Sequence, residues 1–366
     1  MNNTTKILTL LIVVILLSSA SKGEIANYDL HIINSQNDQE RFYSSRAINN
    51  NGQVVGVGFI NDTQYPLIWD VNSGFNTFPD GGVAGGINDH GQVIVSSPFR
   101  VYDSDGTAIY THDEYDSIGT DINNNTRATG VCIFDEPYGH AFLWGQTAGM
   151  EDIGTLGGDK SYGYAINDNG DIVGRSSVDS GMLADDYAFL WARDDGMVNL
   201  GTLPTFDLGS CAYDINNSNK IIGESYSSIA THAFIWDNDN GMQDIGTLLG
   251  HSSAVAINDF GLVIGKSYDY DSPSIGFIWS EADGMVSISD LLTFSYSGYN
   301  ILDAYDINNH NQIVALAELD GEQYHVLLTP VPEPTSILFF LAGSMAFLRK
   351  KGVMSKTKNE VKRKAI

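Results

Sequence analysis

The chain has 366 residues and a formal net charge of −26, which is distributed unevenly along the sequence. Residues 24–330 contain 9 Lys and Arg against 43 Asp and Glu, a balance of −34 that disfavours nucleic acid and anionic lipid as partners. Residues 349–366 contain 8 cations and one glutamate, a balance of +7, so the C-terminal tail is a separate basic segment. The length allows one large all-β domain or two ordinary domains.

The N-terminus has the pattern of an export signal. Lys6 precedes an apolar run of eleven residues, 7–17, whose only polar member is Thr9, and small residues follow at 18–20. A membrane-spanning helix needs roughly 20 apolar residues, so a permanent anchor is the weaker alternative. We predict that residues 1–23 are a signal peptide.

The body of the chain repeats an Ile-Asn motif seven times. The clearest copy is YAINDNGDIVG at residues 164–174, and the spacing between successive copies varies from 35 to 50 residues. The motif asparagines are Asn49, Asn88, Asn123, Asn167, Asn216, Asn258 and Asn308.

Two further blocks follow most Ile-Asn motifs. The second block, HAFLW at residues 140–144, gives way after a turn to a third block, GMEDIGTL at 149–156. In the second and seventh repeats, residues 97–102 and 324–330 take the place of the tryptophan block. The second block contains every tryptophan of the protein, namely Trp69, Trp144, Trp191, Trp236 and Trp279.

Each repeat predicts four short strands in two hairpins. The Asn/Asp-x-Gly sequence after Ile-Asn favours a tight turn, since these residue types tolerate positive φ. The apolar runs are nearly continuous, which indicates sheets covered on both faces. Four strands per 40 to 45 residues is typical of a propeller blade. Residues 27–32 would complete the seventh repeat, which ends after its third strand. We therefore predict an all-β fold, a β-propeller of about seven four-stranded blades over residues 27–330, closed by the N-terminal strand.

The two cysteines lie on different predicted blades. Cys132 falls on the second strand of the third blade and Cys211 on the first strand of the fifth. A disulfide needs Cα atoms within about 7 Å of each other. We predict two buried thiols that are not joined by a disulfide.

Together, the three blocks resemble the HAF family of extracellular repeats over roughly residues 27–330. This resemblance implies a surface or secreted protein, and it implies little about the ligand, because the ligands of the family are largely undefined.

The C-terminal sequence VPEPTSILFFLAGSMAFLRKK at residues 331–351 resembles a PEP-CTERM sorting signal. The resemblance implies export by the Sec machinery, lodging in the inner membrane, and cleavage by an exosortase at Pro332, Glu333 and Pro334. The basic cluster Arg349, Lys350 and Lys351 would stay on the cytoplasmic side. The protein would then reach the cell surface or the extracellular matrix, often with exopolysaccharide.

The apolar run of this signal is short. Residues 335–348 would span about 21 Å as a helix, less than the ~30 Å of a hydrocarbon core. A stable tail anchor and a helix packed on the ring are the alternatives. The basic tail at residues 352–366 departs from the usual pattern, in which the chain stops soon after the basic cluster.

Signals for catalysis or metal binding are weak. His140 and His232 occupy equivalent positions in different repeats, so we interpret them as strand residues. Asn167-Asp168-Asn169-Gly170-Asp171 lacks the spacing of a calcium loop, and turn formation accounts for it. We predict no metal or cofactor, with weak calcium binding by surface carboxylates as an alternative. The tryptophans are predicted to pack between blades, and an exposed row that stacks on sugars is the alternative.

Two classes of function remain. The first is a non-enzymatic surface scaffold or adhesin that binds at one mouth of the ring, through loops such as residues 176–186 and 203–210. The second is a secreted hydrolase or lyase acting on polysaccharide, with a carboxylate pair that the sequence does not single out. The candidate carboxylates are Asp185, Asp186, Asp194 and Asp195.

Overall fold

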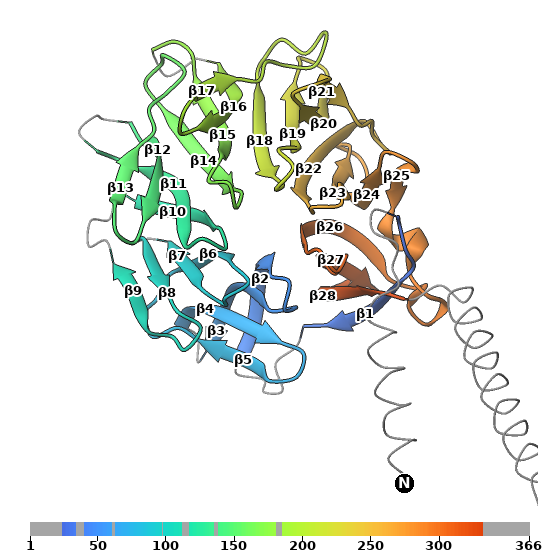
Figure 1. Cartoon of the computed structure of the whole chain (residues 1–366). Coiled ribbons are helices and arrows are strands. Elements are labelled where there is room, and N and C mark those ends of the chain that lie inside the picture. The colour runs from blue at the N-terminus through green and yellow to red at the C-terminus, as the bar shows by residue number, and fades with distance from the viewer. Residues whose placement is uncertain are drawn as a thin grey trace, which may run out of the picture.

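The computed structural model describes residues 24–33, 40–60, 63–96, 98–111, 117–134, 138–180 and 185–331. These residues form 28 β-strands in seven four-stranded antiparallel sheets. The sheets stand around a common axis as the blades of a propeller (Figure 1). The strand nearest the axis is the first of each sheet in six blades and β26 in the seventh, where β1 is the outer edge strand. The predicted fold and the number of blades are confirmed.

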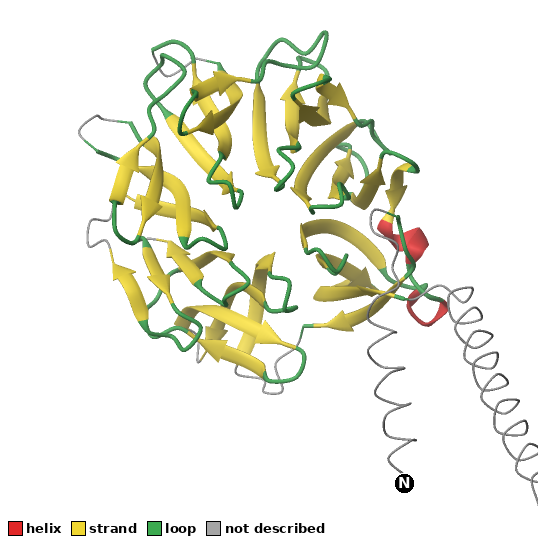
Figure 2. Ribbon diagram, viewed as in Figure 1, coloured by secondary structure: helices red, strands yellow, loops and turns green. Residues whose placement is uncertain are grey.

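The strands follow one another in chain order. The first four blades are β2 (Glu40–Ile48), β3 (Val54–Ile60), β4 (Thr63–Asp70) and β5 (Gly74–Thr77); β6 (Val83–Ile87), β7 (Val93–Ser96), β8 (Arg100–Tyr102) and β9 (Ala108–Thr111); β10 (Ser117–Ile122), β11 (Arg127–Cys132), β12 (His140–Gly145) and β13 (Gly149–Asp152); and β14 (Ser161–Ile166), β15 (Ile172–Ser177), β16 (Asp186–Ala192) and β17 (Gly196–Asn199). The last three are β18 (Ser210–Ile215), β19 (Ile221–Tyr226), β20 (Thr231–Asp237) and β21 (Gly241–Asp244); β22 (His251–Ile257), β23 (Val263–Tyr268), β24 (Ile275–Ser280) and β25 (Gly284–Ser287); and β26 (Asn300–Ile307), β27 (Ile313–Leu319) and β28 (Glu322–Pro330) with β1 (Tyr28–Ile32). Two short 3-10 helices, η1 (Ile288–Leu291) and η2 (Phe294–Tyr296), connect the sixth blade to the seventh (Figure 2).

The N-terminal strand closes the ring. β1 pairs antiparallel with β28, and Tyr28 lies opposite Pro330. The backbone N–H of Val331 donates to the carbonyl of Asn27 at 2.8 Å, which extends this pairing beyond the strands. The seventh blade is thus assembled from both ends of the described chain, as the repeat pattern predicted.

The hydrophobic core lies between successive blades. Leu143 of the third blade packs in one cluster with Phe189 and Trp191 of the fourth, and Ile153 from the connection between these blades belongs to the same cluster. A single blade has two apolar faces, so only its neighbours on both sides can cover it. The nearly continuous apolar runs of the sequence reflect this arrangement.

The second strand of a blade passes very close to the first. A Cβ atom built on Gly174 would lie 1.8 Å from the carbonyl oxygen of Tyr162, at a point where β14 contains a bulge. A side chain cannot be accommodated there without displacing backbone. The same close approach occurs in five blades, at Gly56, Gly130, Gly174, Gly223 and Gly265.

The two cysteines lie where the repeat pattern placed them, on β11 and β18. Both are buried and neither forms a disulfide, so this prediction is confirmed. Residues 1–23, the sorting motif after Val331 and the basic tail at 352–366 lie outside the described residues. Within the described segments, no helix combines the length and apolar character of a membrane-spanning helix.

Candidate functional site

The seven motif asparagines form a closed ring around the propeller axis, which we call the asparagine ring. In each blade the Asn directly follows the strand nearest the axis, and its side-chain Nδ2 donates to the backbone carbonyl of the corresponding Asn in the next blade. The seven distances lie between 2.8 and 3.3 Å. The last bond, from Asn308 to Asn49, joins residues that are 259 positions apart in the chain. The ring therefore ties every blade to its neighbours.

The same side chains also build the turn within each blade. The Oδ1 atom of every ring Asn accepts the backbone N–H of the residue four positions later, at 2.9–3.1 Å. The residue three positions after the Asn has positive φ in all seven blades, as in Gly170 (φ 89) and Asn219 (φ 58). Asn suits this position because one short side chain supplies both an acceptor for its own turn and a donor for the next blade.

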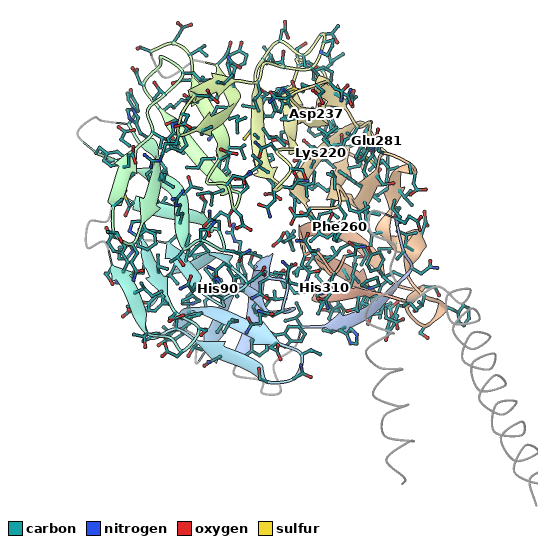
Figure 3. The ribbon with its side chains drawn as sticks, viewed as in Figure 1. His90, Lys220, Asp237, Phe260, Glu281 and His310 are labelled. Carbon is teal, nitrogen blue, oxygen red and sulfur yellow. The ribbon has the colours of Figure 1, made fainter. Side chains whose placement is uncertain are left out.

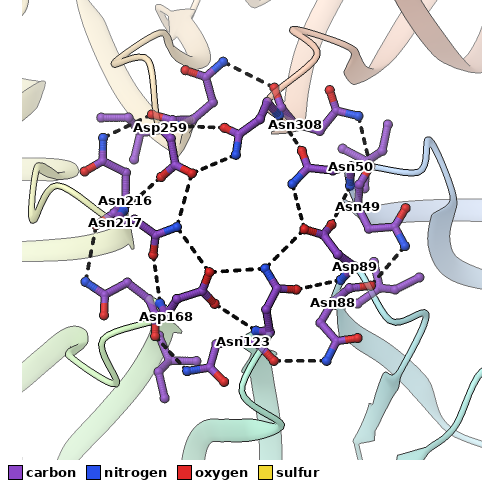
Figure 4. Close-up of a pocket in the computed structure, with 18 of the residues that line it drawn as sticks. Asn49, Asn50, Asn88, Asp89, Asn123, Asp168, Asn216, Asn217, Asp259 and Asn308 are labelled. Carbon is purple, nitrogen blue, oxygen red and sulfur yellow. Dashed lines mark hydrogen bonds between the residues drawn. The ribbon is translucent and has the colours of Figure 1, made fainter.

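A second ring lies inside the first and consists of the residues that follow the ring asparagines. Figure 4 shows their side chains linked around a central opening. The backbone N–H of each member donates to Oδ1 of the next member at 2.8–2.9 Å. This inner ring consists of Asn50, Asp89, Asn124, Asp168, Asn217, Asp259 and Asn309.

Amides and carboxylates alternate in the inner ring. The Oδ2 atom of Asp168, for example, accepts from the amides of Asn124 and Asn217 at 3.2 and 3.3 Å. Each of the three carboxylates accepts two amide donors and one backbone N–H, which keeps like charges apart. A ring of seven cannot alternate perfectly, and the two adjacent amides, Asn309 and Asn50, meet where the last blade joins the first.

Three more carboxylates lie two residues before the ring asparagines of alternate blades, at Asp121, Asp214 and Asp306. Asp306 accepts the N–H of its own neighbour Ile307 at 2.8 Å and that of Ile48 in the first blade at 2.7 Å. Asp121 and Asp214 link the third blade to the fourth and the fifth to the sixth in the same way.

Burial raises the pKa of these three carboxyl groups. The pKa of Asp121 rises to about 6 and that of Asp306 to about 7, while the pKa of Asp214 rises well above its usual range. Hydrogen bonds from the backbone oppose the effect of burial. Repulsion adds to it, from Asp168 of the inner ring for Asp121 and from other members of this set for Asp214 and Asp306.

The two rings enclose a small polar cavity of about 170 Å³ on the axis. The turn residues His90, Phe260 and His310 lie around the central opening in Figure 3. In the described part of the chain, no group of three or more His, Cys, Asp or Glu residues is arranged to hold a metal ion. The geometry of the two rings is suited to holding the blades together.

The other predicted residues are dispersed over the blades. The five tryptophans lie on the third strands of the first, third, fourth, fifth and sixth blades, and Trp144 is completely buried. His140 and His232 pair with Asp152 and Asp244 of the neighbouring strand at 2.9 and 2.7 Å.

The structure describes the four candidate carboxylates but not the predicted sorting residues. Asp186 lies within 3.3 Å of Lys160 and 3.7 Å of Arg175, and it is engaged in these ion pairs. Asp185, Asp194 and Asp195 are exposed. The sorting residues lie outside the described residues, namely Pro332, Glu333, Pro334, Arg349, Lys350 and Lys351.

Sequence reasoning missed the six axial carboxylates. Their signal is visible afterwards: Asp follows the ring Asn in the second, fourth and sixth blades, and precedes it by two residues in the third, fifth and seventh. Within a single repeat, an Asp at either position looks like an ordinary turn residue. Its role appears only when neighbouring repeats are placed side by side.

Comparison with known proteins supports the fold. No protein-family model matches the sequence, and no curated protein is significantly similar to it. Among solved structures, the β-propeller domain of the Trilobed protease from Pyrococcus furiosus is similar at 12% identity and a TM-score of 0.54, over 80% of this chain and 93% of that one. Acylaminoacyl peptidase from Pyrococcus horikoshii matches at 12% identity and a TM-score of 0.47, over 76% of this chain and 50% of that one. The Aleuria aurantia lectin matches at 8% identity and a TM-score of 0.37, over 80% of this chain and 98% of that one. At 12% identity the likeness to the first of these structures is one of fold alone. The seven four-stranded sheets make the chain a seven-bladed β-propeller.

Proposed function

We propose that this protein is an exported, non-enzymatic binding scaffold of the cell surface or extracellular matrix, associated with polysaccharide. The observation that carries the proposal is that the polar side chains on the axis are already hydrogen-bonded to one another. In the inner ring each carboxylate accepts three hydrogen bonds from its neighbours, as Asp168 does from Asn124 and Asn217. Groups held in this way rigidify the ring, and a rigid ring presents its outer surfaces and loops in fixed positions for binding.

The alternative is a hydrolase or lyase that acts on polysaccharide. The raised pKa values of Asp121, about 6, and Asp306, about 7, favour it, because a general acid needs a carboxyl group that stays protonated near neutral pH. The hydrogen bonds of these carboxylates argue against catalysis. Each carboxylate oxygen accepts one backbone N–H, so neither oxygen is free to act on a substrate.

A paired assay separates the two functions. The protein is screened on a glycan array and, in parallel, incubated with the bound glycans while released reducing ends are measured. Binding without release supports the scaffold. Release that disappears in the Asp306→Asn variant, while this variant remains folded, would establish the enzyme instead.

We further propose that the chain is delivered by the PEP-CTERM route, with residues 1–23 removed on export and an exosortase acting at Pro332, Glu333 and Pro334. The apolar run and basic cluster that follow the motif support this proposal. Intact-mass analysis of the protein from its own host tests both cleavages. A mature chain that keeps its leader and is recovered from the cytosol would refute export.

A further inference from the structure

A groove of about 690 Å³ lies on the outer side of the propeller, where the last blade meets the first. One wall is β1 of the seventh blade, from Leu30 to Ile32. The opposite wall is the turn between β4 and β5 of the first blade, and Tyr296 and Tyr299 from the connection around η2 complete the lining. In Figure 1 the end of β1 lies beside the turn between β4 and β5. We call this cavity the seam groove.

Aromatic side chains form much of the seam groove. Trp69 is 6% exposed and lies opposite Phe75 across the β4–β5 hairpin, so these two rings form a fixed floor. Tyr296 and Tyr299 are half-buried, with ring centroids 6.4 Å apart. Flat aromatic surfaces of this kind pack against the C–H faces of ligands while the tyrosine hydroxyls remain available for hydrogen bonds.

Several polar side chains of the seam groove do not bond to other described residues, in contrast to those of the axial rings. Among the described residues, the side chains of His31 and Asn72 and the hydroxyls of Tyr296 and Tyr299 have no hydrogen-bond partner. Asp70 accepts two turn N–H groups through Oδ1, at 2.8 and 3.2 Å, which orients the carboxylate and leaves Oδ2 available. The groove therefore combines aromatic faces with the oriented carboxylate of Asp70 and with side-chain donors and acceptors that have no partner among the described residues.

The edge of β1 contributes backbone groups as well. Ile33 N–H donates to His325 at 2.8 Å, so alternate residues of β1 pair with β28 while Leu30 and Ile32 direct their N–H and C=O groups outward. The outward carbonyl of Tyr28 is already occupied by the N–H of Thr293, at 2.9 Å.

The short open edge helps to identify the ligand. Within the described part of this edge, only Leu30 and Ile32 direct backbone groups outward without a partner, which is too little for an added peptide strand to form a ladder. Residues 24–330 carry a balance of −34, and Asp70 lies in the groove itself, so anionic ligands are disfavoured. A neutral ligand rich in hydroxyls and with apolar C–H faces satisfies both the aromatic and the polar lining.

We propose that the seam groove binds a short segment of a neutral glycan chain. This inference rests on the proposed polysaccharide-binding function and adds the site and the class of sugar. Trp69, Phe75, Tyr296 and Tyr299 supply the packing surface, and the hydroxyls of the sugar bond to the polar groups around it.

The test is calorimetric titration of the full-length protein in detergent with cellohexaose, laminarihexaose and mannohexaose. Hexagalacturonate serves as the anionic counterpart. At least one neutral hexasaccharide should bind, and hexagalacturonate should bind at least tenfold more weakly. The double variant Tyr296→Ala/Tyr299→Ala should weaken binding at least tenfold, and His31→Ala several-fold.

Two features of the design keep the result interpretable. Tyr270→Ala is the matched control, because Tyr270 is 88% exposed on another blade and should leave the affinity within twofold. His31 is exposed and lacks a described partner, so its removal leaves the fold intact even if the double variant loses η2. Unchanged melting temperatures establish that each variant is folded.

The outcomes distinguish the two proposals. If neutral glycans bind and the groove variants bind equally well, the seam groove is refuted while the scaffold function stands. Preferential binding of hexagalacturonate would also refute the groove. If no hexasaccharide binds and the glycan array is negative too, both proposals fail.

Discussion

Replacement of Asn167 by Ala should test whether the asparagine ring stabilises the propeller. Asn167 is 4% exposed and accepts the N–H of Asp171 at 2.9 Å. Its Nδ2 donates to Asn219 Oδ1 at 2.7 Å and to the carbonyl of Asn216 at 3.3 Å. Each lost bond reduces stability by roughly 0.5–1.5 kcal/mol, and unpaired buried partners add to this. We expect a loss of about 2–5 kcal/mol.

The same turn supplies the control. Asn169 is exposed, and its longer contacts to Asn217 and Asn219, at 3.5 and 3.4 Å, predict that Asn169→Ala changes stability by no more than about 0.5 kcal/mol. Urea unfolding followed by tryptophan fluorescence measures both variants, and a thermal scan should show a drop of roughly 5–10 °C for Asn167→Ala alone. Equal stabilities of the two variants would refute a stabilising role for the ring.

Three further predictions concern strand packing, an unpaired hydroxyl and pH. Gly223→Ala should destabilise the fold by more than about 3 kcal/mol, because its Cβ would lie 1.9 Å from a backbone carbonyl oxygen. Gly196 has positive φ (75°) but open space around it, so Gly196→Ala should reduce stability by only about 1 kcal/mol in the same urea assay. Tyr28→Phe should be neutral or stabilising by about 1 kcal/mol in thermal unfolding, because the buried hydroxyl has no partner among the described residues, and a clear loss of stability would contradict this. The raised pKa values of Asp121, about 6, and Asp306, about 7, mean that the folded state binds more protons than the unfolded chain between about pH 4 and 7. Stability should therefore rise as the pH falls through this range, on the order of 3–4 kcal/mol per group, and urea unfolding of Asp306→Asn should show a smaller change. An unchanged pH dependence in that variant would contradict the assignment.

Much of the architecture could be predicted because each repeat contains its own local signals. The turn after Ile-Asn, the apolar strands and the incomplete seventh repeat are all readable from segments of about forty residues. Asn167 and Gly170 favour a turn whether or not a neighbouring blade exists. The seventh repeat lacks a fourth strand of its own, which predicts that residues 27–32 supply it. The pairing of Tyr28 with Pro330 confirms this inference.

The roles of the axial carboxylates could not be predicted in this way. Asp121 bonds to Ile166, Asp214 to Ile257 and Asp306 to Ile48, so each partner lies on the next blade. Within a single repeat these residues are indistinguishable from polar turn residues. The raised pKa values depend on burial and on mutual repulsion, both of which arise only when the ring is closed.

The all-β class, the blade count, the closing strand and the separation of the two cysteines could all be inferred from periodicity along the chain. The meeting of amides and carboxylates on the axis, and the groove lined by Leu30, Trp69 and Tyr296, became visible in the folded molecule alone. Strand and turn formation depends on neighbours in the chain. Hydrogen bonds between blades and the shape of a groove depend on how segments that are distant in the sequence are positioned in the folded structure.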